Sequence, residues 1–262
     1  MRRPLPELVL GLIASELQAD KQALLSFSLL SSSHVFPARQ YLFRQLTIKL
    51  DAVDKTIDRL IALLKDQPNI PFYIRNLTLV QTDIDKPTHS SLNLGHISQV
   101  VCNIPYLEAL RLEAVTWSTP TASYVALTPH SHLNTLELSH VQGVEPLDNP
   151  LELLCLASHW HSVVIHNTAC RQELQAPAQH PLSISTLRLH WQASSRGWLL
   201  SLDQAKLVFA GVKHVQLVAP FDRHDYEQVH TILLGGADAI QKLTLNVLHW
   251  LWHSRAKLLV GI

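Results

Sequence analysis

Cysteine and glycine are scarce in this 262-residue sequence, and both shortages exclude classes of site. The three cysteines, Cys102, Cys155 and Cys170, are an odd number without C-x-x-C spacing, so they predict neither a disulfide framework nor a zinc knuckle. Cys102 and Cys155 lie in apolar helical phrases, where we expect buried thiols and therefore a reducing compartment. The eight glycines are dispersed apart from Gly235 and Gly236, which excludes a phosphate-binding loop and a dinucleotide fingerprint.

Charge is also low, because charged residues make up 16% of the chain and 21 basic residues balance 21 acidic ones. A chain without net charge gives no indication of nucleic acid or a membrane surface as a partner. No apolar run approaches the ~18 residues of a membrane span. Pro4, Pro6 and Glu7 interrupt the resemblance of the N-terminus to a secretory signal. We therefore expect a cytoplasmic or nuclear protein, and a secreted repeat receptor only if the N-terminal stretch is cleaved.

Catalytic motifs are missing, although histidine is abundant. No serine or cysteine lies in a G-x-S-x-G turn. The carboxylate pairs Asp83 with Asp85 and Asp222 with Asp225 fit turns and helix starts, where capping explains them. The 16 histidines are scattered over different segments, whereas a metal site needs three ligands and a second shell. We therefore expect no catalytic residue, no cofactor and no bound metal.

One leucine-rich phrase, L-x-x-L-x-L, recurs along the chain and is clearest between Ile104 and Leu138. Its middle residues are Leu77, Leu110, Leu136, Val163, Leu187, Val215 and Leu243. They are separated by 33, 26, 27, 24, 28 and 28 residues, in or near the ~20–29-residue period of leucine-rich repeats. The spacing predicts an α/β fold in which residues 51–262 form a leucine-rich-repeat-like solenoid of about seven repeats. Parallel strands would form its concave face, with helices and loops on the convex face. An ordinary α/β domain with parallel strands is the alternative.

Helices are expected between these strands. Asp51 to Asp66 is the clearest amphipathic segment, with an apolar stripe at helical spacing. The other predicted helices are Leu94 to Cys102, Leu151 to Ser158, Leu200 to Ala210 and Asp222 to Leu234. Few residues follow the last phrase, which leaves little room for a polar cap and suggests a truncated or short member.

The residues between the leucines of each strand point away from the core, because side chains alternate along a strand. They are mixed in charge, as expected of a surface that binds a target protein. The residues that we assign to this partner-binding face are Arg111, Glu113, Glu137, His166, Arg188, His190, His214 and Lys242.

Residues 4–50 predict three short helices. The first covers residues 6–17, the second is capped by Asp20, and the third runs from Phe36 to Phe43 with Pro37 in its first turn. Helices this short bury too little surface to be stable alone. They must pack on another part of the protein, either as a simple cap of the solenoid or as a binding module.

Four phrases in this segment carry a family resemblance. They are Pro4 to Val9, Leu12-Ile13, Leu24 to Leu29 and Phe36 to Arg44. Together they resemble the F-box-like segment of a set of fungal proteins, in which a leucine-rich-repeat array often follows. Gly11, Ser32 and His34 depart from that pattern: His34 stands where Trp or Phe usually packs, and Gly11 interrupts the first helix.

The resemblance implies a non-catalytic, substrate-recruiting subunit of an SCF-type cullin–RING ubiquitin ligase. Residues 4–50 would bind the ligase adaptor and the repeats would bind the target protein. The positions implied to face the adaptor are Leu5, Pro6, Leu8, Ile13, Leu24, Leu25 and Leu29. A repeat scaffold for protein interactions without ligase association is the alternative.

Overall fold

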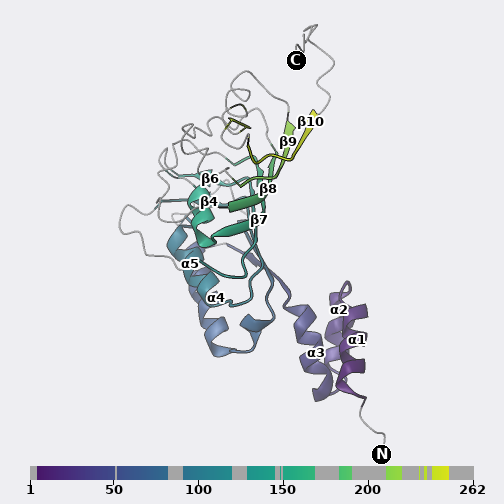
Figure 1. Ribbon diagram of the computed structural model, residues 1–262. Coiled ribbons are helices and arrows are strands. Elements are labelled where there is room, and N and C mark those ends of the chain that lie inside the picture. Colours follow the sequence, from purple (N-terminus) through teal and green to yellow (C-terminus); the bar gives the residue numbers. More distant parts are fainter. Residues whose placement is uncertain are drawn as a thin grey trace, which may run out of the picture.

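The computed structural model describes residues 5–50, 52–81, 91–119, 129–144, 148, 150–168, 183–190, 211–219, 230, 233–234 and 238–247. Within these ranges the protein is an α/β fold built on one parallel sheet of eight strands (Figure 1). The predicted helix Leu200 to Ala210 and nearly all of Asp222 to Leu234 lie outside the described residues, as does Cys170.

The eight strands lie in the sheet in the order in which they occur in the chain, and every pairing is parallel. They are β1 (Gln45–Lys49), β2 (Asn76–Val80), β3 (Ala109–Glu113), β5 (Thr135–Ser139), β7 (His159–His166), β8 (Ser183–His190), β9 (His214–Ala219) and β10 (Lys242–Val247). Leu77 pairs with Leu110, and Leu110 with Leu136, so the middle leucines form one row across the sheet. The prediction of parallel strands at these positions is confirmed.

Strand β1 was missed in the sequence. Phe43, Leu46 and Ile48 have the spacing of the leucine-rich phrase, but Phe43 belongs to the segment that we assigned to the N-terminal module. In the structure Leu46 pairs with Leu77, and Phe43 packs against the core of the sheet. The sheet therefore begins at residue 45, before the boundary at residue 51.

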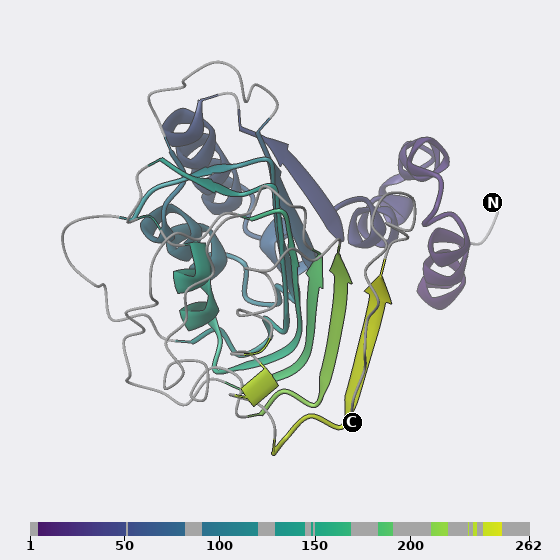
Figure 2. The ribbon, with the colours of Figure 1, turned by 90° about the horizontal axis from the view of Figure 1, so that it is seen from above.

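One face of the sheet carries the main core. Leu77, Leu110 and Leu136 are at most 1% exposed, and helices α4 (Val53–Asp66) and α5 (Leu94–Cys102) lie on this side (Figure 2). The apolar stripe of α4 is buried in the same core. At the other end of the row Leu243, predicted to be buried, is 43% exposed. Among the described residues, its strand β10 is at the edge of the sheet and pairs with β9 alone.

The segment predicted as a helix from Leu151 to Ser158 is instead a 3₁₀-helix, η2 (Pro150–Leu156). Two residues separate its end from His159, the first residue of β7. A 3₁₀-helix rises ~2.0 Å per residue against ~1.5 Å in an α-helix, so it covers the same distance with fewer residues.

Asn93 caps α5 by accepting a hydrogen bond from the His96 backbone nitrogen at 2.9 Å. A second 3₁₀ turn, η1 (Ile70–Phe72), follows α4.

The chain turns sharply after three successive strands. Ala114, His140 and Asn167 each follow a strand and have positive φ angles of 53°, 55° and 44°. The Ala114 N–H donates to Ser139 O at 2.8 Å, and the His140 N–H donates to His166 O at 2.9 Å. The turns at Ala114 and His140 lead into a small second sheet of β4 (Thr116–Trp117) and β6 (Gln142–Gly143).

The turn at Ala114 predicts a stabilising substitution. A left-handed backbone costs an L-residue about 1–2 kcal/mol, and glycine avoids this at a cost in chain entropy. We expect Ala114→Gly to raise the free energy of unfolding by about 0.5–1 kcal/mol, measured by urea denaturation. The matched variant Ala109→Gly lies inside β3 and should destabilise; similar effects at both positions would contradict this account of the turn.

The N-terminal helices form a module with its own core. They are α1 (Glu7–Glu16), α2 (Lys21–Ser28) and α3 (Ser32–Leu42). The residues of this second core are Leu10, Ala14, Leu24, Phe27 and Ala38. Asp20 caps α2 as predicted, since its Oδ1 accepts from the Ala23 nitrogen at 3.0 Å. Both views place the module apart from α4 and α5, on the other side of the sheet (Figures 1 and 2).

Helix α3 starts four residues earlier than predicted, so Pro37 lies inside it and not in its first turn. The Ser31 hydroxyl lies 2.6 Å from His34 Nδ1. The His34 ring packs edge-on against Phe27 with 4.6 Å between ring centroids. The imidazole thus packs as an aromatic ring against the core of the module.

The module joins the sheet at two points. Arg44 O accepts hydrogen bonds from the Arg75 and Asn76 backbone nitrogens, both at 3.0 Å, which ties the end of α3 to β2. Phe36 packs edge-on against Tyr73 with 5.7 Å between ring centroids.

Candidate functional site

The first candidate site is the face of the sheet opposite α4 and α5, which we call the strand face (Figure 2). The register places Arg111 beside Glu137, and His166 beside His190. All eight residues predicted for the partner-binding face occupy strand positions that alternate with the apolar anchor positions. The structure therefore brings Arg111, Glu137, His166 and His190 together on adjacent strands β3 to β8.

Arg111 is the centre of a charged group at the β3 end of this face. Its Nη2 lies 3.5 Å from Glu113 Oε2, and its Nε lies 3.5 Å from Glu137 Oε1. The Nε atom is shielded from solvent and makes no hydrogen bond to any described residue, so the pair with Glu137 is an ion pair without hydrogen-bond geometry. Two carboxylates therefore share one guanidinium, and this part of the face keeps little free positive charge.

The histidine pair lies next to this group. The rings of His166 and His190 are 3.9 Å apart between centroids and tilted by 34°. Burial, with smaller contributions from His190, Arg111 and His140, lowers the pKa of His166 to about 4. His166 Nε2 lies 3.8 Å from Glu137 Oε1. Because the imidazole is uncharged at neutral pH, that contact is not an ion pair under those conditions.

The second candidate site is the apolar surface of the N-terminal module. Leu8 and Leu12 on α1 are 78% and 59% exposed, Leu25 on α2 is 46% exposed, and Leu29 and Leu30 in the following turn are 85% and 70% exposed. Exposed leucines in this density are unusual for the surface of a soluble domain unless another molecule covers them.

The positions implied to face an adaptor divide into two groups. Leu5, Pro6, Leu8, Leu25 and Leu29 are exposed and available for contact. Leu24 is fully buried in the core of the module, and Ile13 is partly buried against it. Leu24 therefore holds α2 in place and does not reach the surface. Leu12 and Leu30 were missed among the exposed leucines, although helical spacing from Leu8 places Leu12 on the same side of α1.

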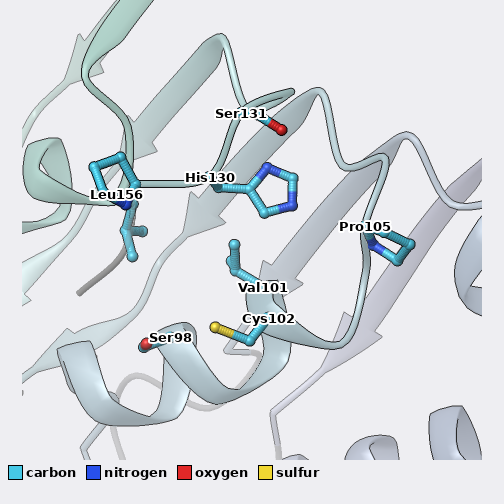
Figure 3. Close-up of a pocket in the computed structure, with 8 residues that line it drawn as sticks. Ser98, Val101, Cys102, Pro105, His130, Ser131 and Leu156 are labelled. Carbon is cyan, nitrogen blue, oxygen red and sulfur yellow. The ribbon is translucent and has the colours of Figure 1, made fainter. Parts of the chain in front are cut away.

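A cavity of about 290 Å³ lies between α5 and the segment before β5 (Figure 3). Cys102 and His130 both line it, and the Cys102 thiol is exposed, contrary to the prediction of a buried thiol. His130 Nε2 lies 2.9 Å from Ile104 O, and Nδ1 accepts from the Leu133 nitrogen at 3.2 Å. Both ring nitrogens thus form hydrogen bonds with backbone atoms, so His130 is not free to activate the thiol.

Sequence reasoning also missed a partly buried carboxylate, Glu152 in η2. Its Oε1 accepts from Trp117 Nε1 at 2.9 Å and lies 3.5 Å from the Thr119 hydroxyl. The pKa of Glu152 is raised to about 7, because the effects of partial burial and of the Asp148 charge outweigh the hydrogen bonds from Trp117 and Thr119, which lower it. Burial, with a smaller contribution from Glu152, also raises the pKa of the Cys155 thiol. The sequence signal that could have indicated this site is a glutamate inside the apolar run PLELLCL, Pro150 to Leu156.

The described residues form neither a metal-binding cluster nor a membrane-spanning helix. No three His, Cys, Asp or Glu side chains in the described ranges are placed to hold one metal ion. The helices of this part of the chain are all too short or too polar to cross a bilayer.

The fold and both surfaces define an α/β protein with a parallel sheet and a separate helical module. Comparison with protein-family models, with curated proteins and with solved structures found no match.

Proposed function

We propose that the chain is a non-catalytic, substrate-recruiting subunit of an SCF-type cullin–RING ubiquitin ligase. In this proposal α1 to α3 bind the ligase adaptor, and the strand face binds a target protein. The sheet is a leucine-rich-repeat solenoid in which each repeat supplies one strand and one crossover. The transfer of ubiquitin would belong to partner subunits.

The solenoid interpretation is supported by the strand order. Each inner strand of the sheet pairs with the sheet strands that precede and follow it in the chain. The middle residues of neighbouring strands are in register. A stacked array in which each repeat contacts only its neighbours has this order. The second strands, β4 and β6, also pair in parallel at equivalent places in two successive repeats.

The adaptor interpretation rests chiefly on the exposed leucines of the N-terminal module. The module has its own small core, so Leu8 and Leu25 are not required for its packing. Their exposure leaves apolar surface uncovered, and burying such surface stabilises association by roughly 25 cal/mol per Å² before the costs of binding.

Co-precipitation of the ligase adaptor with the full chain tests this function. We expect the wild type to retain the adaptor, and Leu8→Asp and Leu25→Asp each to lose it, because a carboxylate would be buried in the interface without a partner. Leu63→Asp on α4 is the matched control, since Leu63 is 45% exposed and should keep the adaptor. If the wild type retains no adaptor, the repeat scaffold without ligase association replaces this proposal.

A further inference from the structure

The two halves of the strand face differ in charge. Arg111 on β3 is matched by Glu113 and Glu137. On β8, β9 and β10, the outward positions with described side chains include no carboxylate. They are Thr186, Arg188, His190, His214, Gln216, Val218, Lys242 and Thr244.

We propose that Arg188, His190, His214 and Lys242, here called the basic half-face, bind an acidic peptide segment of the target protein. The inference rests on the proposed function of the strand face and adds the chemical class of the target. Charge complementarity selects this occupant, because the basic half-face offers two fixed cations and two imidazoles and no carboxylate from the described residues.

The register brings these four side chains within reach of one peptide. His214 on β9 lies beside Thr186 on β8 and Lys242 on β10, and Arg188 is two residues beyond Thr186. Neighbouring strands lie ~4.8 Å apart, and alternate residues of a strand lie ~6.8 Å apart. These spacings place Arg188 and Lys242 ~12 Å apart, and side chains four residues apart in an extended peptide are ~14 Å apart, so two carboxylates of one peptide can contact both.

Binding of an acidic peptide to the basic half-face needs several contacts that act together. Arg188, His214 and Lys242 are exposed, and a single exposed ion pair contributes only ~0.2–1 kcal/mol. The helices α4 and α5 lie on the opposite side of the sheet (Figure 2).

Protonation of His190 should make peptide binding depend on pH. Burial lowers its pKa, Arg188 lowers it further, and Glu137 raises it. The His166 ring stacks on it, and Arg111 and His140 act on His166 in turn. A carboxylate arriving at His190 raises its pKa, so the complex holds more protons than the free protein. Affinity should therefore rise as pH falls from about 7 to about 5.

The test uses the full chain and a fluorescein-labelled ten-residue peptide that alternates Glu and Ser. A second peptide with Gln at each Glu is the neutral control, and fluorescence anisotropy measures both affinities. We expect the acidic peptide to bind at least about tenfold more tightly than the neutral one, and more tightly at pH 5.5 than at pH 7.5. The double variant Arg188→Glu/Lys242→Glu should lose about tenfold in affinity.

The control variant is Arg59→Glu/Lys65→Glu, which reverses two exposed charges on α4. It should bind the acidic peptide within about twofold of the wild type. Equal affinity for both peptides, or equal losses in both double variants, would overturn the inference. Adaptor co-precipitation by Arg188→Glu/Lys242→Glu should be unchanged, so failure of the acidic-peptide inference is distinct from failure of the ligase proposal.

Discussion

Replacement of Leu110 by alanine is expected to lower the free energy of unfolding by about 2–5 kcal/mol. Leu110 is fully buried in the row of leucines that crosses the sheet, between Leu77 on one side and Leu136 on the other. Removing its isobutyl group forfeits buried apolar area and leaves a cavity that rigid neighbouring strands cannot close. Urea denaturation followed by circular dichroism measures this loss.

The matched control is Leu63→Ala. Leu63 is a leucine of α4 that is 45% exposed, so its truncation should change stability by less than about 0.5 kcal/mol. Similar losses at Leu110 and Leu63 would contradict the assignment of the middle leucines to the core.

The second large effect is a change in pH dependence on replacing Glu152 by glutamine. The pKa of Glu152 rises from 4.5 to about 7 on folding, so the folded state holds a proton that the unfolded state has released. Stability therefore falls as pH rises from about 4.5 to 7 and is constant above that range. With allowance for partial solvent exposure, we expect this contribution to reach about 1–2 kcal/mol.

Glu152→Gln keeps an oxygen for Trp117 Nε1 and removes the titration. Between pH 5 and pH 8, stability of the variant relative to the wild type should increase by about 1–2 kcal/mol, measured by urea denaturation at both values. Leu153→Ala alters the same 3₁₀-helix without removing an ionisable group, and its effect should be equal at the two pH values. Parallel pH profiles for wild type and Glu152→Gln would refute the role of this partly buried carboxyl.

The histidine pair acts in the opposite direction over part of this range. Because the pKa of His166 is lowered to about 4, the unfolded state binds its proton more readily than the folded state. Stability from this group is lost as pH falls from 6.5 toward 4. The wild-type profile combines both groups, and the single variant at Glu152 separates them.

Period and spacing were enough to predict seven of the eight strands of the sheet. The alternation of leucine with polar residues set which side of each strand is buried, and Leu110 and Leu136 lie in the core as expected. Near-constant spacing predicted parallel strands in chain order. The outward residues Arg111 and Glu137 followed from the same alternation, and their ion pair follows from the register.

Features that depend on tertiary packing could not be predicted from the sequence. Leu24 and Leu25 are adjacent leucines of α2, yet one is buried and the other is exposed, because the position of α3 decides which side of α2 is covered. Helix α3 continues through Pro37, whose local preference suggested a first-turn position. The link between Glu152 and Trp117 joins residues 35 positions apart, which no local pattern indicates.

The central proposal is that the N-terminal module binds a cullin–RING ligase adaptor. Its most direct test is a titration of the purified full chain with purified adaptor, followed by biolayer interferometry, for the wild type, Leu8→Asp and Leu63→Asp. The proposal predicts saturable binding by the wild type and by Leu63→Asp, and at least about 100-fold weaker binding by Leu8→Asp. It is contradicted if the wild type does not bind while circular dichroism shows that its helices are folded, or if Leu8→Asp binds as tightly as the wild type.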